Sequence, residues 1–325
     1  MRNPRSTLAW AALIGAASLA LGLPAAAQQQ NRISITTGGT GGVYYPLGGG
    51  MAAILSKYVP GMQATAEVTG GSVDNLKLIN AGKSEVGFSM ADAASEAYEG
   101  VDKFKDGKVN ARTLMVLYPN KTHVVTLEGT GITKLADLRG KRVSTGSPGS
   151  GTEILAMRIL EAAGIDGKKD IRQERLSVAE SANAMKDRKI DAFFWSGGLP
   201  TAAVTDLATT PGIKIRLIDH DEVVDAMNSK YGALYVKSTI PAGTYAGQDK
   251  PNAEVDVWNI LVASDKMSDA MAYTIVKTLF EKKPDLVAVH KEAQNIDLKS
   301  QVSGSPIPFH PGAKKYLEEQ GVKVK

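Results

Sequence analysis

Short apolar segments alternate with amphipathic helical segments along this chain, and this alternation restricts its fold more than any other feature. In the first helical segment, Leu47, Met51, Ile54 and Leu55 fall on one face of a helix that extends to Tyr58. Further helices are predicted at 155–163, 178–188, 269–282 and 311–320. Strands are predicted at 32–37, 63–68, 85–89, 112–118, 123–127, 141–145, 171–176, 190–195, 213–218 and 255–263. Strands that alternate with helices predict an α/β fold with largely parallel sheets.

Two extended segments divide this pattern into two units. A first β-α-β-α-β series leads into the stretch 112–127, and a second series runs from 141 to 218. Another extended segment, 256–264, follows the second series. The pair resembles two hinge crossings, so we predict one lobe from 28–119 with 259–325 and a second from 120–258. Each lobe would have its own mostly parallel sheet, and one continuous sheet is the alternative.

The first 27 residues have the features of a signal peptide. Arg2 and Arg5 precede an apolar run, and Ala25-Ala26-Ala27 fits a signal peptidase site. We therefore expect residues 1–27 to be cleaved and the mature protein to begin near Gln28 in the periplasm. A retained N-terminal anchor is the alternative.

Composition argues against several functional classes. The chain has no cysteine, which excludes disulfides, thiol nucleophiles, zinc–thiolate sites and lipid attachment. Its net charge of +4 falls to +2 when Arg2 and Arg5 are removed, and the charges are interspersed, so nucleic-acid binding is not expected. The four histidines show no metal-binding spacing, and no P-loop or Gly-x-Ser-x-Gly motif occurs. We expect no cofactor, no metal and no enzymatic activity.

Three loops rich in Gly, Ser and Thr, at 36–45, 70–75 and 144–152, each join a predicted strand to a predicted helix. The N-terminus of a helix presents free backbone N–H groups and favours negative charge. Ligands of α/β sheets bind beyond the carboxyl ends of the strands, where these loops lie. We therefore predict a pocket for a small anion, contacted by side chains from Tyr44, Ser72, Asn75, Ser147, Ser150 and Thr152.

Each of these residues also has a purely structural interpretation. Gly, Ser and Thr before a helix are ordinary capping and turn residues, and Tyr44 is equally suited to a core. Asp92 is interpreted as a helix cap or a site residue, and Trp195 as a lining of the cleft or as packing between lobes. An exported hydrolase using Ser147 or Ser150 remains an alternative, and it would need a nearby histidine.

Five segments resemble one family of proteins. They are 37–48 (TGGTGGVYYPLG), 68–76 (VTGGSVDNL), 146–153 (GSPGSGTE), 191–198 (DAFFWSGG) and 240–245 (IPAGTY). In this order, along essentially the whole mature chain, they resemble the TAXI family, the extracytoplasmic solute-binding proteins associated with TRAP transporters.

The resemblance implies a two-lobed periplasmic binding protein of the type II-like class, whose lobes are joined by two chain crossings. It also implies a TRAP membrane permease as partner and a ligand such as a C4 or C5 dicarboxylate, 2-oxoglutarate, glutamate or glutamine. The protein is expected to be a monomer, and a ligand sensor without transport is the alternative. The implied pocket residues are Thr40, Gly41, Tyr44, Ser72, Asn75, Ser147, Ser150, Thr152 and Trp195. The pattern supplies no carboxylate-binding arginine, and Arg112, Arg175 and Arg216 remain candidates.

Overall fold

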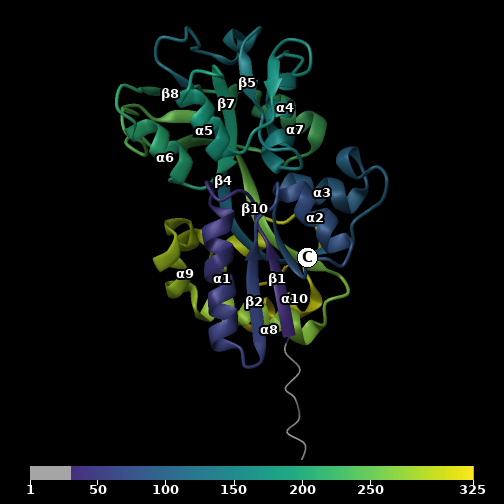
Figure 1. Cartoon of the computed structure of the whole chain (residues 1–325). Helices are drawn as coiled ribbons and strands as arrows, with labels where there is room; N and C mark the ends of the chain where they lie inside the picture. Colours follow the sequence, from purple (N-terminus) through teal and green to yellow (C-terminus); the bar gives the residue numbers. More distant parts are fainter. Residues whose placement is uncertain (1–30, 325) are drawn as a thin grey trace, which may run out of the picture.

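The computed structural model describes residues 31–324, which form two lobes joined by two long strands (Figure 1). The predicted signal peptide lies outside the described residues. Lobe I contains β1 (Asn31–Thr36), α1 (Tyr44–Tyr58), β2 (Met62–Glu67), α2 (Ser72–Asn80), β3 (Val86–Met90), α3 (Ala91–Glu99), α8 (Asp269–Glu281), α9 (Lys283–Val289) and α10 (Pro311–Glu319). None of the helices within 31–324 has the length and apolar character needed to cross a membrane.

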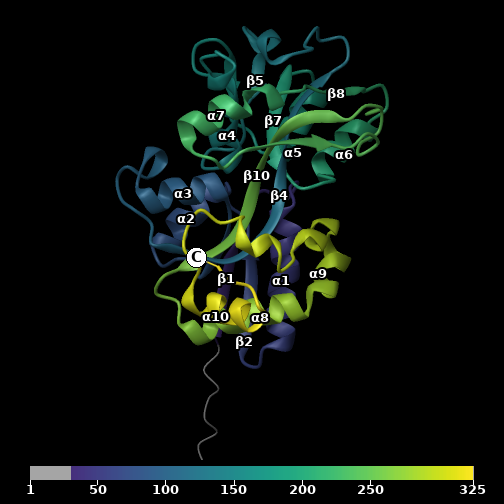
Figure 2. The ribbon, with the colours of Figure 1, turned by 180° about the vertical axis from the view of Figure 1, so that it is seen from behind.

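Lobe II is built from the middle of the chain. Its elements are β5 (Arg142–Ser144), α4 (Gly151–Ala162), β6 (Arg172–Glu174), α5 (Val178–Lys186), β7 (Ala192–Gly197), α6 (Ala202–Thr209), β8 (Ile215–Leu217), α7 (Val224–Tyr231) and β9 (Val236–Ile240). The strands β4 (Ala111–Leu127) and β10 (Asn252–Ser264) run from one lobe into the other, as the view from behind also shows (Figure 2).

The two lobes share one hydrogen-bonded sheet, which corrects the prediction of two separate sheets. The strand order is β2-β1-β3-β10-β4-β7-β5-β6, with β8 on β4 and β9 on β10. The predicted strands 112–118 and 123–127 are both parts of β4, because the chain stays extended through Pro119 and Asn120. Pro119 lies opposite Trp258, next to a shift in the register of β10. A strand can accommodate a proline at such an irregularity, because a regular ladder hydrogen bond is already missing there.

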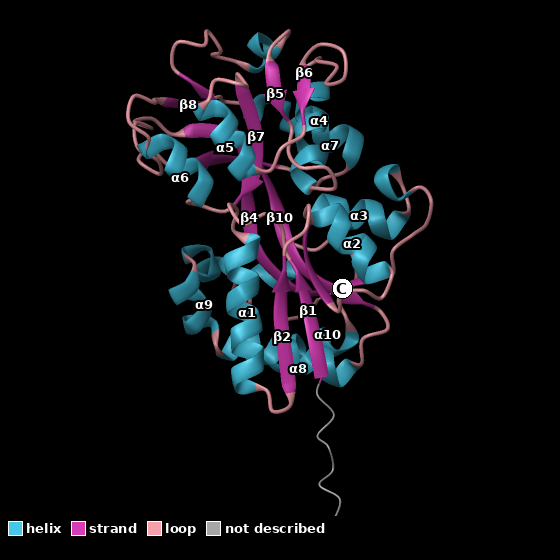
Figure 3. Cartoon of the chain, in the orientation of Figure 1, coloured by secondary structure: helices cyan, strands magenta, loops and turns pink. Residues whose placement is uncertain are grey.

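The sheet is mixed, whereas a largely parallel one was predicted (Figure 3). Within lobe I, β1 pairs in parallel with β2 and β3, and within lobe II, β5 pairs in parallel with β6 and β7. The two crossing strands pair antiparallel with each other and with β3 and β7. The α/β class is confirmed, and the crossings account for the antiparallel centre.

Each lobe has its own hydrophobic core. One cluster of buried side chains draws almost entirely on residues before 119 and after 259, and two others draw mainly on residues between 124 and 257. On α1, Leu47, Met51, Ile54 and Leu55 are buried as predicted, whereas Tyr58 at the end of that face is exposed. The lobe boundaries predicted from the sequence stay a prediction.

Candidate ligand-binding site

A cavity of about 50 Å³ lies between the lobes, at the ends of the strands where the three predicted loops meet. Lobe I lines it with the loop before α1, the loop before α2, Met90 and Tyr118. Lobe II lines it with the loop before α4, the first residues of α5 and the end of β7. The lining residues are Gly38, Gly39, Gly42, Val43, Tyr44, Gly70, Gly71, Ser72, Met90, Tyr118, Gly146, Ser147, Ser150, Gly151, Thr152, Ser177, Val178, Trp195, Ser196 and Gly197.

The structure brings six of the ten sequence-predicted site residues to this cavity and places four elsewhere. Those that line it are Tyr44, Ser72, Ser147, Ser150, Thr152 and Trp195. Thr40 is exposed. The carbonyl of Gly41 accepts a hydrogen bond from the Ala203 N–H at 3.3 Å, so this residue joins the lobes beside the cavity.

Asn75 is a structural residue of lobe I that supports the cavity from behind. Its side-chain amide donates to the carbonyls of Thr37 at 2.7 Å and Phe88 at 2.8 Å, and its Oδ1 accepts from Thr69 Oγ1 at 2.6 Å. These bonds use the polar atoms of the side chain and tie together the loops that precede α1 and α2. Asn75 therefore positions two of the predicted loops.

Some of the helix N-termini are already occupied, contrary to the expectation of free N–H groups. The N–H groups of Val73 and Asp74, in the first turn of α2, donate to the Gly149 carbonyl at 3.1 and 3.2 Å. Gly149 belongs to lobe II, so one lobe caps a helix of the other. At α4, Ser150 Oγ accepts from the Glu153 N–H at 3.1 Å.

Two buried hydroxyl groups that the sequence analysis missed face the cavity without a partner. Tyr118 on β4 has no exposed surface and Ser196 on β7 is 5% exposed, and neither hydroxyl has a hydrogen-bond partner within residues 31–324. Burial raises the pKa of Tyr118 well above its usual value, so its hydroxyl remains protonated. An unsatisfied buried hydroxyl is costly, and a ligand in the cavity would remove that cost. Ser196 lies in the FFWSGG segment, while Tyr118 carried no sequence signal beyond ending a predicted strand.

Two of the three aromatic residues of the lining, Trp195 and Tyr44, are held by side chains behind them. Trp195 Nε1 donates to Thr201 Oγ1 at 2.8 Å, and the Thr201 N–H donates to Tyr245 Oη at 3.1 Å. The Tyr44 hydroxyl donates to the side chain of Asn259, on the crossing strand β10. Both rings are thus fixed by the protein before any ligand binds.

The lining contains no charged side chain among the described residues. The three candidate arginines lie away from it: Arg112 donates to its neighbour's carbonyl, Arg175 pairs with Glu153, and Arg216 lies on β8 opposite Thr126. Within residues 31–324, no group of three His, Asp or Glu side chains is placed to hold a metal ion. The polarity of the cavity therefore comes from hydroxyl groups and helix N-termini.

Within residues 31–324, the structure shows no serine–histidine arrangement of the kind that the hydrolase alternative requires. Ser150 Oγ donates to the Ser147 carbonyl at 2.7 Å while it caps α4. The hydrogen bonds recorded for the four histidines involve other groups, such as Tyr245 for His123 and the Ile218 carbonyl for His220. No described histidine is in position to activate either serine.

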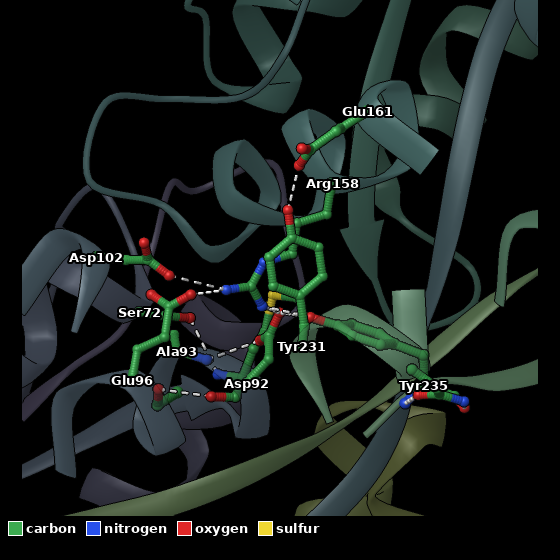
Figure 4. A network of polar contacts seen from close by, with 12 residues as sticks. Ser72, Asp92, Ala93, Glu96, Asp102, Arg158, Glu161, Tyr231 and Tyr235 are labelled. Carbon is green, nitrogen blue, oxygen red and sulfur yellow. Dashed lines mark hydrogen bonds and ion pairs between the residues drawn. The ribbon is translucent and has the colours of Figure 1, made fainter. Parts of the chain in front are cut away.

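Beside the cavity, Arg158 of α4 inserts into a cluster of carboxylates from lobe I (Figure 4). Its Nη1 lies 3.3 Å from Asp92 Oδ2, and its Nη2 pairs with Glu96 and lies 3.7 Å from Asp102 Oδ2. Tyr235 Oη donates to Asp92 Oδ2 at 3.0 Å. Asp92 is completely buried and belongs to this ion cluster, outside the cavity lining.

The fold is shared with solved binding-protein components of import systems. The binding protein component of an ABC phosphonate transporter from Pseudomonas aeruginosa has a TM-score of 0.53 at 11% identity, over 82% of this chain and 80% of that one. The zinc-bound ligand-binding component of an ABC-type import system from Staphylococcus aureus has a TM-score of 0.50 at 13% identity, over 90% and 92% of the two chains. The model of the NMT1-like family matches residues 35–321, and the chain belongs to that family.

Proposed function

We propose that this protein is a periplasmic solute-binding protein that captures a small organic anion between its lobes and delivers it to a membrane permease. The observation that carries the proposal is the cavity at the lobe boundary, with the free hydroxyls of Tyr118 and Ser196 facing it from different lobes. The two solved neighbours are binding components of an ABC phosphonate transporter and of an ABC-type import system, which supports the same role. Nothing in the site favours catalysis.

The finer assignment rests on the resemblance of the five loop segments to TAXI proteins. On that basis we propose a TRAP permease as the partner, and a C4 or C5 dicarboxylate, 2-oxoglutarate or a glutamate-like amino acid as the ligand. The ABC importers among the neighbours make an ABC permease the alternative partner. We also propose that the protein is a monomer whose lobes, 28–119 with 259–325 and 120–258, close on the ligand.

The free energies of single contacts indicate how the site would reach a micromolar dissociation constant. A helix N-terminus contributes about 0.3–1 kcal/mol toward an anion, whereas a micromolar dissociation constant requires about 8 kcal/mol. Hydrogen bonds to a charged group add about 1.5–3 kcal/mol each. The available donors are the hydroxyls of Tyr118 and Ser196 and the N–H groups of Gly151 and Thr152. These two N–H groups lie in the first turn of α4, where the helix itself has no carbonyl placed to accept from them.

Calorimetric titration of the exported protein tests this function. The panel consists of acetate, pyruvate, succinate, malate, 2-oxoglutarate, glutamate and glutamine. We expect at least one compound to bind with a micromolar or lower dissociation constant and to be recovered chemically unchanged. If every compound fails to bind below about millimolar concentration, or if one is turned over, the proposal is wrong. A TRAP permease gene beside this one would support the TRAP assignment, and an ATPase subunit gene would support an ABC importer.

A further inference from the structure

Within residues 31–324, the cavity between the lobes is lined by hydrogen-bond donors and by no negatively charged acceptor. Its lining residues include no Asp or Glu among those the structure describes. The hydroxyls of Tyr118 and Ser196 are unpartnered and at least nine-tenths buried. The helices α1, α2, α4 and α5 all begin at the cavity, and the N-terminus of a helix carries partial positive charge. The electrostatics of the site therefore favour an anion and disfavour a cation.

Two carboxylates of lobe I that lie close in sequence to lining residues, Asp74 and Asp92, are already engaged. Asp74 Oδ2 accepts from the Gly70 N–H at 3.2 Å, behind the loop that faces the cavity. Asp92 Oδ1 accepts from the Ala93 N–H at 2.8 Å, and its Oδ2 lies in the ion cluster with Arg158. Neither side chain can turn toward a ligand without abandoning these partners.

A third carboxylate, Glu292, lies near Tyr118 and is also engaged. Its Oε2 accepts from Asn295 Nδ2 at 2.6 Å, and its Oε1 accepts from the Leu199 N–H. Burial raises the pKa of Glu292, which further reduces its use as a partner for a cation. Among residues 31–324, the lining of the cavity thus offers no free anionic group to an ammonium ion.

An α-amino acid would bring its ammonium group into this environment. The hydroxyl oxygens of the lining can accept a hydrogen bond from ammonium, but they cannot neutralise its charge. Burying a charge without a partner of opposite sign is strongly unfavourable. The corresponding oxo acid keeps the carboxylates and replaces the ammonium with a carbonyl, which the hydroxyls of Tyr118 and Ser196 can donate to.

We propose that the site selects organic acids without an amino group, and that it binds a 2-oxo or 2-hydroxy acid in preference to the α-amino acid of the same carbon skeleton. This inference rests on the proposed function and narrows its ligand class. It separates 2-oxoglutarate from glutamate, two ligands between which the loop motifs do not decide.

Two matched pairs test the inference by calorimetry on the exported protein: pyruvate against L-alanine, and 2-oxoglutarate against L-glutamate. In any pair that binds, we expect the oxo acid to bind at least tenfold more tightly. Equal or tighter binding of the amino acid overturns this inference and leaves the proposed solute-binding function intact. Failure of both pairs, and of the wider panel of acids, removes the proposed function and the inference together.

Variants test the physical reason for the preference. Tyr118→Phe removes one free donor and should weaken binding of the oxo acid at least fivefold. Ser196→Asp supplies the missing carboxylate, so the preference for the oxo acid should shrink at least tenfold. Ser147→Asp, at a less buried position of the lining, provides a second test if Ser196→Asp does not fold. The exposed Ser303→Asp controls for net charge and should leave the preference unchanged. An unchanged preference in both lining variants contradicts the proposal.

Discussion

Arg158 on α4 and Asp92 on α3 form a buried ion pair across the boundary between the lobes, with 3.3 Å between Nη1 and Oδ2. Their side chains are 7% and 0% exposed, so water screens the pair little. Glu96 and Asp102 surround the same guanidinium, and the Tyr231 ring lies 4.2 Å from it. The cluster contains the carboxylates of Asp92, Glu96 and Asp102 but only one cation, so it holds more negative than positive charge. The positive charge of Arg158 offsets the cost of burying these carboxylates. We expect this contact to stabilise the closed arrangement of the lobes.

Replacing Arg158 with Gln should therefore weaken ligand binding without touching the cavity. The change leaves Asp92 and Glu96 buried without their cation, which costs about 3 kcal/mol, or roughly a hundredfold in the dissociation constant if the cost falls on closure. Calorimetry measures the affinity, and small-angle scattering reports the separation of the lobes. Arg175→Gln is the matched control, because its partner Glu153 lies in the same lobe. Equal affinities for Arg158→Gln and the wild type would contradict this role.

Gly149→Ala should also disfavour closure. Gly149 has a φ of +75°, and an added Cβ would overlap the carboxylate of Asp74 in the other lobe. The same residue caps α2 through its carbonyl, so displacing it also frees the N–H groups of that helix. Gly164→Ala is a close control, because Gly164 has a φ of +73° and open space around it.

Both glycine variants should lose about 1 kcal/mol of stability from backbone strain, measured by thermal unfolding. Only Gly149→Ala should lose affinity, by about tenfold. Equal affinity losses in the two variants would mean that Gly149 has no role in contact between the lobes.

The stability of the protein should depend on His123 between about pH 6.5 and pH 4. Burial lowers the pKa of His123 to about 4, and Nε2 lies 2.9 Å from Tyr245 Oη. The unfolded chain binds a proton in this range that the folded chain does not, so this contribution to stability is lost as the pH falls. Burial raises the pKa of Glu254 to about 9, which gives a slope of opposite sign over much of the same range, so a comparison of variants is needed.

His123→Gln should reduce the pH dependence of the unfolding free energy by up to about 1.4 kcal/mol per pH unit between those limits. Denaturant unfolding at a series of pH values measures this slope. Burial also lowers the pKa of His220 to about 4, so a His123→Gln, His220→Gln double variant should show about twice the change. A slope that matches the wild type would rule out a buried neutral His123.

Thr201→Val should release the Trp195 ring. The indole N–H donates to Thr201 Oγ1, and the isosteric valine removes that acceptor while it keeps the volume. We expect a shifted Trp195 emission spectrum and roughly a three- to tenfold loss of affinity, on the scale of one hydrogen bond. Measurements in a Trp258→Phe background isolate the signal. Thr209→Val, whose hydroxyl donates to the Thr205 carbonyl within α6, should leave the spectrum and affinity unchanged.

Local sequence patterns predicted much of the architecture. The spacing of Leu47, Met51, Ile54 and Leu55 predicted α1 and its buried face, because a helical period of 3.6 residues is a local property. The pattern did not predict β9, because most of its residues are exposed and its pairing depends on β10. It also divided β4 at Pro119, because a proline normally interrupts a strand and only the register of β10 accommodates it.

The candidate site shows the same limit. Small residues between strand and helix marked the loops that line the cavity, and Ser72, Ser147, Ser150 and Thr152 were found in this way. Tyr118 was missed, because a tyrosine at the end of a predicted strand gives no indication in the sequence that its hydroxyl lacks a hydrogen-bond partner. Asn75 and Asp92 were predicted as site residues because they are polar. In the structure the Asn75 side chain hydrogen-bonds to backbone carbonyls and Asp92 pairs with Arg158.

The sequence by itself determined much of the alternation of strands and helices and the Gly/Ser/Thr chemistry of the loops between them, because periodicity and turn chemistry act over a few residues. Only the tertiary structure decided which polar groups remained free to meet a ligand. Arg158 and Asp92 are 66 positions apart, and Gly149 caps a helix of the other lobe. These contacts depend on how β4 and β10 set one lobe against the other, and such long-range geometry leaves no local trace in the sequence.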